Sequence, residues 1–460
     1  MKKATNDFTT GSVDKKLIDF AIPIILGNIL MQFYNYADSV IVGRFVGKEA
    51  LAAVGASTPF IFMLVSFIIG ISIGATIIIA QYYGKNDYTN IRKASDSLYI
   101  FLAISAIIIS TLGCMFSGKV MQLIGLPPEI IPQATTYLNI YMIGLIFLFL
   151  FNSLSAILRG VGDSKTPLIF LAVSAVLNVA LDLLFVVVFG FGIEGAAWAT
   201  VISQGFAVTF AFIYTARHNE IVSTNLMKLR FDTAIFLRSL KLGIPAGMQQ
   251  LFVSIGMLAI MSFVNGFGTD TIAGYAAASR IEAFVFVIPL NLSIAVTNFT
   301  AQNYGAGLKD RVRLGVRAAL KFSLVASFVI LIVLSALSLP LMKMFSPEVS
   351  VINVGTTYLY VLGVTFPLFA VMFCYMGALR GMGNTIVPMF ITLFSLWIVR
   401  VPLAGVLSDC WGEIGIWLSG SASWALGAIV AYIFYRREYR KELSEPIHAI
   451  EVVEDIESIV

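Results

Sequence analysis

RGVGDSKTP at residues 159–167 returns as RGMGNTIVP at residues 380–388, 221 residues later along the chain. QYYG at 81–84 and QNYG at 302–305 are separated by the same interval. Several matches at one spacing indicate an internal duplication, which decides the architecture before any residue-level argument. Two further pairs keep the interval to within one residue: Arg92 with Arg313, and Pro23 with Pro245.

The duplicated stretch is a Gly-rich turn that ends in Pro. Glycine permits positive φ and proline opens a following helix, so each copy predicts a turn between two helices. A phosphate-binding loop is excluded because no Gly-Lys-Ser/Thr follows the glycines. We therefore interpret both copies as parts of the scaffold.

The composition indicates an integral membrane protein. Of 460 residues, 58% are hydrophobic and 12% are charged, against about 25% charged in soluble domains. A helix needs ~20 residues to cross a bilayer. Twelve apolar runs are long enough, the first at 17–43 and the last at 414–435. Barrel strands need only about 10 residues, so these runs predict helices. The first run is too long for a signal peptide, and we expect it to be retained.

The duplication and the spans together predict an all-α membrane fold of twelve transmembrane helices. Each copy holds six spans, so both copies cross the bilayer in the same direction and form two parallel six-helix repeats around a central cleft. Parallel repeats of this kind are a recurrent transporter design. The expected parts are an N-terminal lobe at 1–216, a cytoplasmic linker at 217–239, a C-terminal lobe at 240–441 and an acidic cytoplasmic tail at 442–460.

The basic residues give the orientation. All but six of the 30 Lys and Arg lie in the N-terminus, in every second loop or in the C-terminal segment. By the positive-inside rule these parts are cytoplasmic. We therefore expect a protein of the plasma (inner) membrane with both termini in the cytoplasm. The six exceptions are Arg44, Lys48, Lys119 and Lys343 in the opposite loops, and Arg280 and Arg400 within spans.

Other residue types exclude several functions. The net charge of +4 reflects the topology, so no nucleic-acid partner is expected. The odd cysteine count, three, implies no disulfide framework, and no metal or cofactor motif appears. The two histidines, His218 and His448, lie in the linker and tail, so no catalytic set for an enzyme is present.

Two carboxylates of the first half share one depth in the membrane. Asp38 in the first span and Asp182 in the fifth lie roughly 8–11 Å below the outer edge of the hydrocarbon. Asn178 precedes Asp182 by four residues and shares its helix face. Intramembrane acids are costly and face a protein interior or a wet cavity, and two acids in one pocket cannot both stay ionised cheaply. The sequence predicts a proton-binding site; the structural alternative is that Asp38 accepts hydrogen bonds from Ser39, Tyr34 or a helix end and never titrates.

The second half lacks both acids. At the repeat interval, Asp38 corresponds to about Ile260 and Asp182 to Leu403. This half instead carries Arg280 and Glu282 in span 8 and Arg400 in span 11. Their depths overlap, so we predict that Glu282 pairs with Arg400 or with Arg280.

The assembled pattern resembles the multidrug and toxic compound extrusion (MATE) family. It comprises twelve spans in two parallel repeats, the first span PIILGNILMQFYNYADSVIVG, QYYG after span 2, RGVGDSKTP after span 4 and LNVALD in span 5. The likeness covers about residues 10–440 and looks closest to the prokaryotic branch named after DNA-damage-inducible protein F.

This resemblance implies an ion-coupled exporter. Asp38, Asn178 and Asp182 match the positions that this branch uses for cation coupling. Pro23 matches the proline at which protonation is proposed to bend the first helix. Further pocket positions implied by the family are Tyr137 or Tyr141 in span 4 and Thr200 in span 6. Apart from the resemblance, Glu282 and the lobe-facing aromatic residues are secondary candidates for substrate contact, and Arg280 and Arg400 are further candidate pocket residues.

The expected function is secondary antiport that exports amphipathic or cationic organic compounds by alternating access. Inward proton movement would drive it, with sodium at the same oxygen ligands as the alternative. Acids of the sodium-coupled branch in spans 7 and 10 are replaced here by neutral residues such as Val253 and Phe369. The alternative function is a lipid-linked saccharide or lipid flippase. A monomer in the lipid bilayer is expected.

Overall fold

The computed structural model describes residues 6–219, 221–222 and 229–444, and these contain helices and no strand. Twelve helices are long and apolar enough to cross a membrane, as the sequence predicts. Most extend past the apolar runs at one or both ends. Their bounds are α1 Val13–Ile41 continued by η1 Val42–Val46, α2 Lys48–Gly84, α3 Tyr88–Leu123, α4 Ile131–Gly160, α5 Lys165–Asp182 continued by η2 Leu183–Val188, α6 Gly192–His218, α7 Thr233–Asn265, α8 Thr269–Gly305, α9 Lys309–Lys343, α10 Val349–Gly381, α11 Ile386–Leu393 with η3 Phe394–Arg400 and α12 Val401–Trp411, and α13 Glu413–Ser444.

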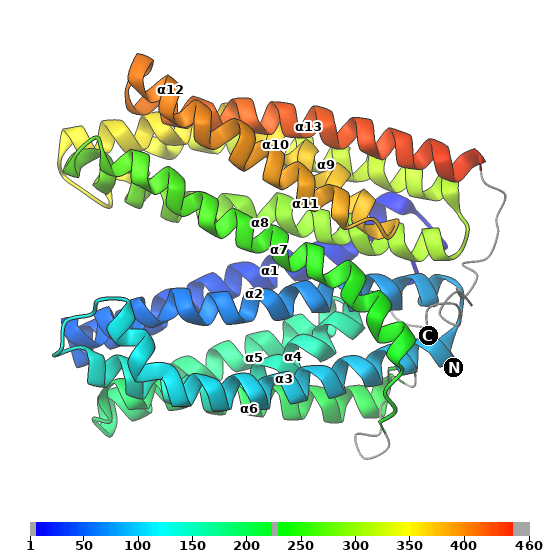
Figure 1. Cartoon of the computed structure of the whole chain (residues 1–460), viewed down its shortest axis with the longest axis horizontal. Helices are drawn as coiled ribbons and strands as arrows, with labels where there is room; N and C mark the ends of the chain where they lie inside the picture. The colour runs from blue at the N-terminus through cyan, green and yellow to red at the C-terminus, as the bar shows by residue number, and fades with distance from the viewer. Residues whose placement is uncertain (1–5, 220, 223–228, 445–460) are drawn as a thin grey trace.

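The helices form two lobes that lie side by side, α1–α6 in one and α7–α13 in the other (Figure 1). The two lobes are called the N-lobe and the C-lobe below. Buried apolar residues form one large cluster in each lobe. The start of α1, with Leu17 and Phe20, belongs to the C-lobe cluster, whereas Ile235 at the start of α7 belongs to the N-lobe cluster. The first helix of each half therefore begins against the opposite lobe.

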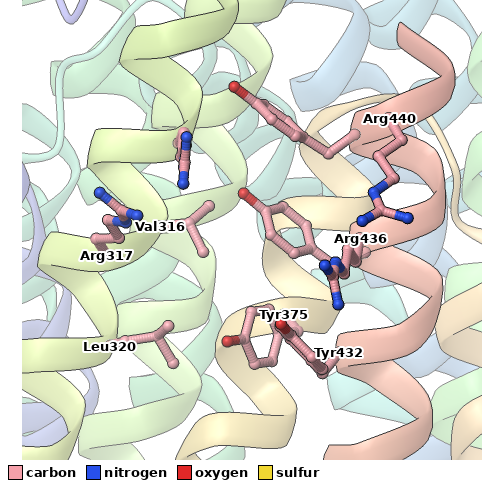
Figure 2. A pocket seen from close by; sticks show the side chains of 10 residues that line it. Val316, Arg317, Leu320, Tyr375, Tyr432, Arg436 and Arg440 are labelled. Atoms are coloured by element: carbon pink, nitrogen blue, oxygen red, sulfur yellow. The ribbon is translucent and has the colours of Figure 1, made fainter. Parts of the chain in front are cut away.

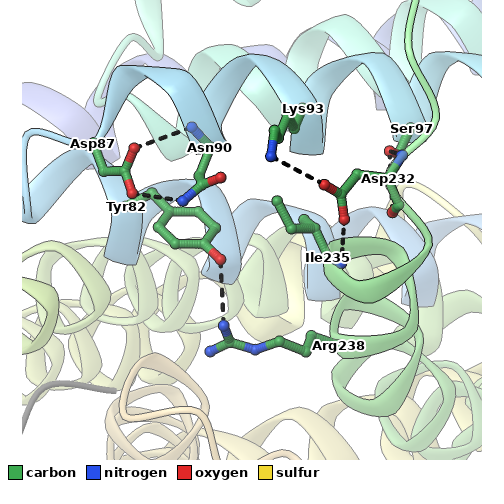
Figure 3. Close-up of polar contacts among 8 residues, drawn as sticks. All are labelled: Tyr82, Asp87, Asn90, Lys93, Ser97, Asp232, Ile235 and Arg238. Atoms are coloured by element: carbon green, nitrogen blue, oxygen red, sulfur yellow. Dashed lines mark hydrogen bonds and ion pairs between the residues drawn. The ribbon is translucent and has the colours of Figure 1, made fainter. Parts of the chain in front are cut away.

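The linker region is fixed to the N-lobe by polar contacts (Figure 3). Asp232 caps α7 by accepting from the Ile235 amide at 3.0 Å, so α7 begins inside the predicted linker of 217–239. The Asp232 amide donates to Ser97 Oγ at 2.8 Å, and its carboxylate lies 3.3 Å from Lys93 Nζ. Arg238 donates to the Tyr82 hydroxyl at 3.3 Å. The second half thus starts from a fixed position on α2 and α3. The tail residues 445–460, including His448, lie outside the described residues.

The repeated QYYG and QNYG motifs join the two lobes at the end of the bundle that carries both termini. Gln81 Nε2 of α2 donates to the Gly381 carbonyl of α10 at 3.2 Å. Reciprocally, Gln302 Nε2 of α8 donates to the Gly160 carbonyl of α4 at 2.9 Å. These two matched hydrogen bonds, called the glutamine clasp below, connect buried groups from opposite lobes.

Glycine is required where α2 and α8 touch beside the clasp. A Cβ on Gly84 would collide with the Gln302 carbonyl oxygen, and one on Gly305 would collide with that of Gln81. The two helices therefore approach backbone to backbone, again with reciprocal partners. The turns predicted from the duplicated stretch are matched as well, because Gly162 and Gly383 both have φ +91°.

The N-terminal segment seals this junction from one side. Phe8 is fully buried, with its ring 5.1 Å from Phe20 and 5.5 Å from Phe299 between centroids. Its amide donates to Gln302 Oε1 at 3.1 Å, and its carbonyl accepts from Arg311 Nε at 2.8 Å. The Gln302 side chain is thereby used twice, as a donor to the N-lobe and as an acceptor from the N-terminus.

Candidate functional site in the N-lobe

The N-lobe holds a group of buried polar oxygens without partners among the described residues. Asp182 is fully buried and Asn178 is 1% exposed. Both Asp182 carboxyl oxygens, Asn178 Oδ1 and Asp38 Oδ1 have no hydrogen-bond partner. An unsatisfied buried acceptor costs about 1–3 kcal/mol, so four of them in one lobe indicate a place built for a proton, a cation or water.

Neighbouring helices bring these groups together. α1 packs against α5, and α5 packs against α6. Asn178 and Asp182 are four residues apart on α5, and the amide of Asn178 donates to Thr200 Oγ1 of α6 at 3.3 Å. The Asp38 charge acts on Asp182 across the α1–α5 contact. The predicted neighbourhood of Asp38, Asn178, Asp182 and Thr200 is thus present.

Tyrosines from α1 and α4 line the same region. The phenols of Tyr34 and Tyr137 both lie within electrostatic range of Asp38 and Asp182. The ring centroids of Tyr137 and Tyr141 are 6.4 Å apart, so the two tyrosines between which the sequence could not decide lie next to each other. Because phenols can donate to a carboxylate and also face a hydrocarbon wall, they suit an acid site inside a lobe.

Ser39 does not serve Asp38. Its hydroxyl donates to the Asn35 carbonyl at 2.9 Å, four residues back along α1. Of the partners that the structural alternative names, Ser39 is therefore excluded, whereas Tyr34 and a helix end stay predictions. Pro23 is buried near the other end of α1, roughly 22 Å along the helix from Asp38, so any influence on the acid must pass along the helix.

Irregular helical turns occur beside the charged positions. The π-helical segment η1 follows Asp38, whose carbonyl accepts from the Val42 amide, and η2 begins directly after Asp182. In the C-lobe, η3 ends on Arg400. π-Helical turns are rare and concentrate at functional sites, where they leave backbone groups able to rearrange.

The C-lobe has Ile260 and Leu403 at the positions that correspond to Asp38 and Asp182, and its buried acid Glu282 lies beside aromatic residues. Glu282 is 8% exposed and interacts with the Tyr358 side chain. The Tyr358 ring lies 4.8 Å from Trp417, and Tyr275 stacks on Trp417 at 5.2 Å. Glu282 with Tyr275, Tyr358 and Trp417 is called the aromatic box below.

The predicted partner arginines of Glu282 do not form a direct ion pair with it. Among the described residues, neither Arg400 nor Arg280 brings a nitrogen within 4.0 Å of its carboxylate. Arg400 instead lies over the Trp424 ring at 5.9 Å, and its charge reaches Glu282 only at longer range. Arg280 is exposed, because residues two apart on a helix face different sides.

The aromatic box was missed at the level of sequence. Its rings come from three helices separated by up to 142 residues, from Tyr275 to Trp417. An aromatic content of 13% is equally expected of a lipid-facing surface. The sequence offers one signal for this group. Tyr275 and Glu282 are seven residues apart on α8 and therefore lie on the same face of the helix.

Comparisons with known proteins agree with the repeat. A sequence model of the MatE family matches residues 23–184 and 245–406, one match in each half. The chain is 33% identical over 430 residues to the probable multidrug resistance protein YpnP of Bacillus subtilis, covering 94% of this chain and 96% of that protein. It is 30% identical to the probable multidrug resistance protein YoeA of the same organism, covering 94% and 95%.

The fold has close counterparts among solved structures. One described as the outward-facing conformation of a multidrug resistance MATE family transporter of the MOP superfamily aligns with a TM-score of 0.91. The alignment covers 97% of this chain and 100% of that chain at 22% identity. The agreement extends to all twelve membrane helices.

Proposed function

This chain belongs to the MatE family of transporters, and on that premise we propose that it is a secondary antiporter for multidrug efflux. It exports amphipathic or cationic organic compounds in exchange for inward movement of a small cation. The observation that carries this proposal is the set of unpartnered oxygens on Asp38, Asn178 and Asp182 inside the N-lobe. A site of this kind gains most from binding a positive charge.

The proton is the proposed coupling ion. Binding one proton to a carboxylate of the Asp38–Asp182 pair removes a buried negative charge and creates a donor for an oxygen that otherwise lacks one. Sodium is the second candidate, because two carboxylates, the Asn178 carbonyl and the Thr200 hydroxyl supply oxygen ligands that a hard cation accepts. In both cases the bound ion must favour one facing state over the other.

The duplicated lobes provide the moving parts. Access from the end that carries the termini requires separation of α2 from α8 and rupture of the glutamine clasp. Each such hydrogen bond contributes about 1 kcal/mol net. Two of them, with the Phe8 packing, give a closure that binding energy at another site can overcome.

We propose that the aromatic box contributes to substrate binding. A buried carboxylate beside three aromatic rings offers both charge and π faces to an organic cation. The flippase alternative has less support, because it needs a strongly basic central cavity between the lobes. Arg280 points to the exposed side of α8, and Arg400 is held against Trp424.

The proposed location is the plasma membrane with both termini in the cytoplasm. The basic residues of the alternate loops and of the end of α13 favour that orientation by the positive-inside rule. Asp38 and Asp182 then lie nearer the external surface, from which the driving cation enters.

Efflux of a fluorescent cationic dye from proteoliposomes tests the proposal, under separately imposed proton and sodium gradients. Asp38→Asn should reduce gradient-driven efflux to the background of protein-free vesicles. Asp19→Asn is the matched control, because Asp19 lies on the same helix and is exposed. Wild-type efflux by Asp38→Asn, with normal reconstitution, would contradict the coupling role.

A further inference from the structure

A hollow lies away from the N-lobe acids, at the end of the C-lobe that carries the C-terminus. Its volume is about 450 Å³, and it opens between α9, α10 and α13. Four arginines line it, Arg313 and Arg317 on α9 and Arg436 and Arg440 on α13. Figure 2 shows Arg317 on one wall and Arg436 and Arg440 on the opposite wall. These four residues are called the arginine pocket below.

Within the described part of the chain, no ion pair compensates the positive charge of the arginine pocket. None of its arginines has a carboxylate within 4.0 Å among the described residues. The acid that acts on its wall is Asp310, whose charge reaches Tyr439. Four like charges around one hollow repel one another, and that repulsion is relieved when an anion enters.

Tyrosines form the remainder of the wall. The Tyr375 ring lies 5.2 Å from Tyr435 and 5.4 Å from Tyr432, and Tyr435 lies 6.1 Å from Tyr439. Tyr435 is 8% exposed, so its ring supports the base of the hollow. Phenolic hydroxyls donate hydrogen bonds, and tyrosine is enriched at the level of lipid headgroups.

The same place in the N-lobe is built differently. At the repeat interval Arg317 corresponds to Asp96, and Leu320 corresponds to the buried Tyr99. The linker covers that side of α3, because the Arg230 amide donates to Asp96 Oδ2 at 3.3 Å. Ile221 and Val222 are buried in the N-lobe cluster. The duplicated scaffold therefore has an acid and a covering segment where the C-lobe has an open basic hollow.

We propose that the arginine pocket binds the phosphate of an anionic phospholipid headgroup. Guanidinium groups match phosphate oxygens in pairs, and basic pockets between membrane helices on the cytoplasmic side suit such headgroups. Val316 and Leu320 line the hollow beside the charges. Deeper in the span, exposed Phe328 on α9 and Ile429 on α13 offer apolar surface to the acyl chains. Lipid bound here bridges α9 and α13 and holds the C-lobe together independently of ion coupling.

Lipid retention by the purified full chain tests this site. The protein in neutral detergent is titrated with dioleoylphosphatidylglycerol, and bound lipid is counted by native mass spectrometry against dioleoylphosphatidylcholine. Arg317→Gln with Arg436→Gln should weaken phosphatidylglycerol retention by at least about tenfold. Lys321→Gln with Arg437→Gln removes the same charge from exposed positions on the same helices outside the pocket and should change it by less than about twofold.

Three outcomes would overturn the proposal. One is unchanged retention in the pocket variant, and a second is an equal loss in the control, which would indicate surface charge alone. The third is displacement of the lipid by an equal concentration of inorganic phosphate, which would assign the pocket to soluble phosphate compounds. The double variant Arg317→Lys with Arg436→Lys keeps the charge and should retain most of the lipid binding. It therefore controls for loss of binding through misfolding. Because the readout is binding, it is independent of whether the dye-efflux experiment succeeds.

Discussion

The two halves of the chain make matching contacts at the end of the bundle that carries both termini, but their side chains differ inside the membrane. At the termini end, Gln81 and Gln302 make reciprocal contacts, and the matched turn glycines adopt the same φ. Inside, the acids Asp38 and Asp182 of the N-lobe have apolar counterparts in the C-lobe. Duplication thus preserved the parts through which the lobes touch, whereas the interior of each lobe acquired its own chemistry.

The reason lies in what each region contacts. Gly84 and Gly305 lie against backbone atoms of the opposite lobe, so no side chain can be added on either side without moving a helix. Interior polar residues meet side chains of their own lobe, which can change together. A duplicated transporter can therefore divide its tasks, with ion coupling in one lobe and substrate contact in the other, while the junction stays symmetrical.

The largest effect is expected from a substitution that removes the chemical difference between the two lobes. Asp182→Leu copies into the N-lobe the residue that the C-lobe has at the corresponding position, Leu403. We expect loss of gradient-driven dye efflux to background, because the site loses a group that titrates or binds a cation. Asp182→Asn should do the same while keeping the volume of the side chain. Leu403→Asn in the C-lobe is the comparison variant, and we expect its efflux to keep its dependence on the ion gradient.

The next effect tests the backbone contact. Gly84→Ala and Gly305→Ala should each destabilise the closed junction by about 1–3 kcal/mol, since each methyl group overpacks a helix contact. The two losses should be similar because the contact is reciprocal. Gly55→Ala on the same α2 helix is the control, because a Cβ there meets nothing within 4 Å. Thermal unfolding in detergent measures the three variants, and a loss in Gly55→Ala as large as in the other two would refute the explanation.

The clasp itself should show a smaller and unequal effect. Gln81→Ala removes one hydrogen bond, about 1 kcal/mol, whereas Gln302→Ala also removes the acceptor of the Phe8 amide. Gln302→Ala should therefore destabilise the junction more than Gln81→Ala. Accessibility of a cysteine placed at Ala301 of α8, which is buried against Ile77 and Ala80 of α2, to a membrane-impermeant thiol reagent reports opening of this end, with the native cysteines replaced. Equal labelling of both variants would show that the N-terminal segment adds nothing to closure.

Much of this arrangement could be predicted from the sequence, but the contacts between lobes could not. Hydropathy identifies the spans because lipid leaves the backbone no alternative to helix. The i, i+4 spacing places Asn178 beside Asp182, and equal depth places Asp38 at their level. Depth does not fix the distance between two side chains, and Arg400 reaches Glu282 only at longer range instead of forming the predicted direct pair. The clasp joins Gln81 to a carbonyl 300 residues away, and no local pattern reports such a partner.

The smallest effect concerns the linker, which has no counterpart in the other half. The ion pair of Lys93 with Asp232 joins side chains that are 47% and 25% exposed, so Lys93→Ala should cost well under about 1 kcal/mol. Ser97→Ala should cost more, about 1 kcal/mol, because the Asp232 amide then loses its buried acceptor at 2.8 Å. Hydrogen exchange of the first turn of α7 measures both, with faster exchange expected in Ser97→Ala. If Lys93→Ala loosened that turn more, the linker would be held by charge rather than by the serine.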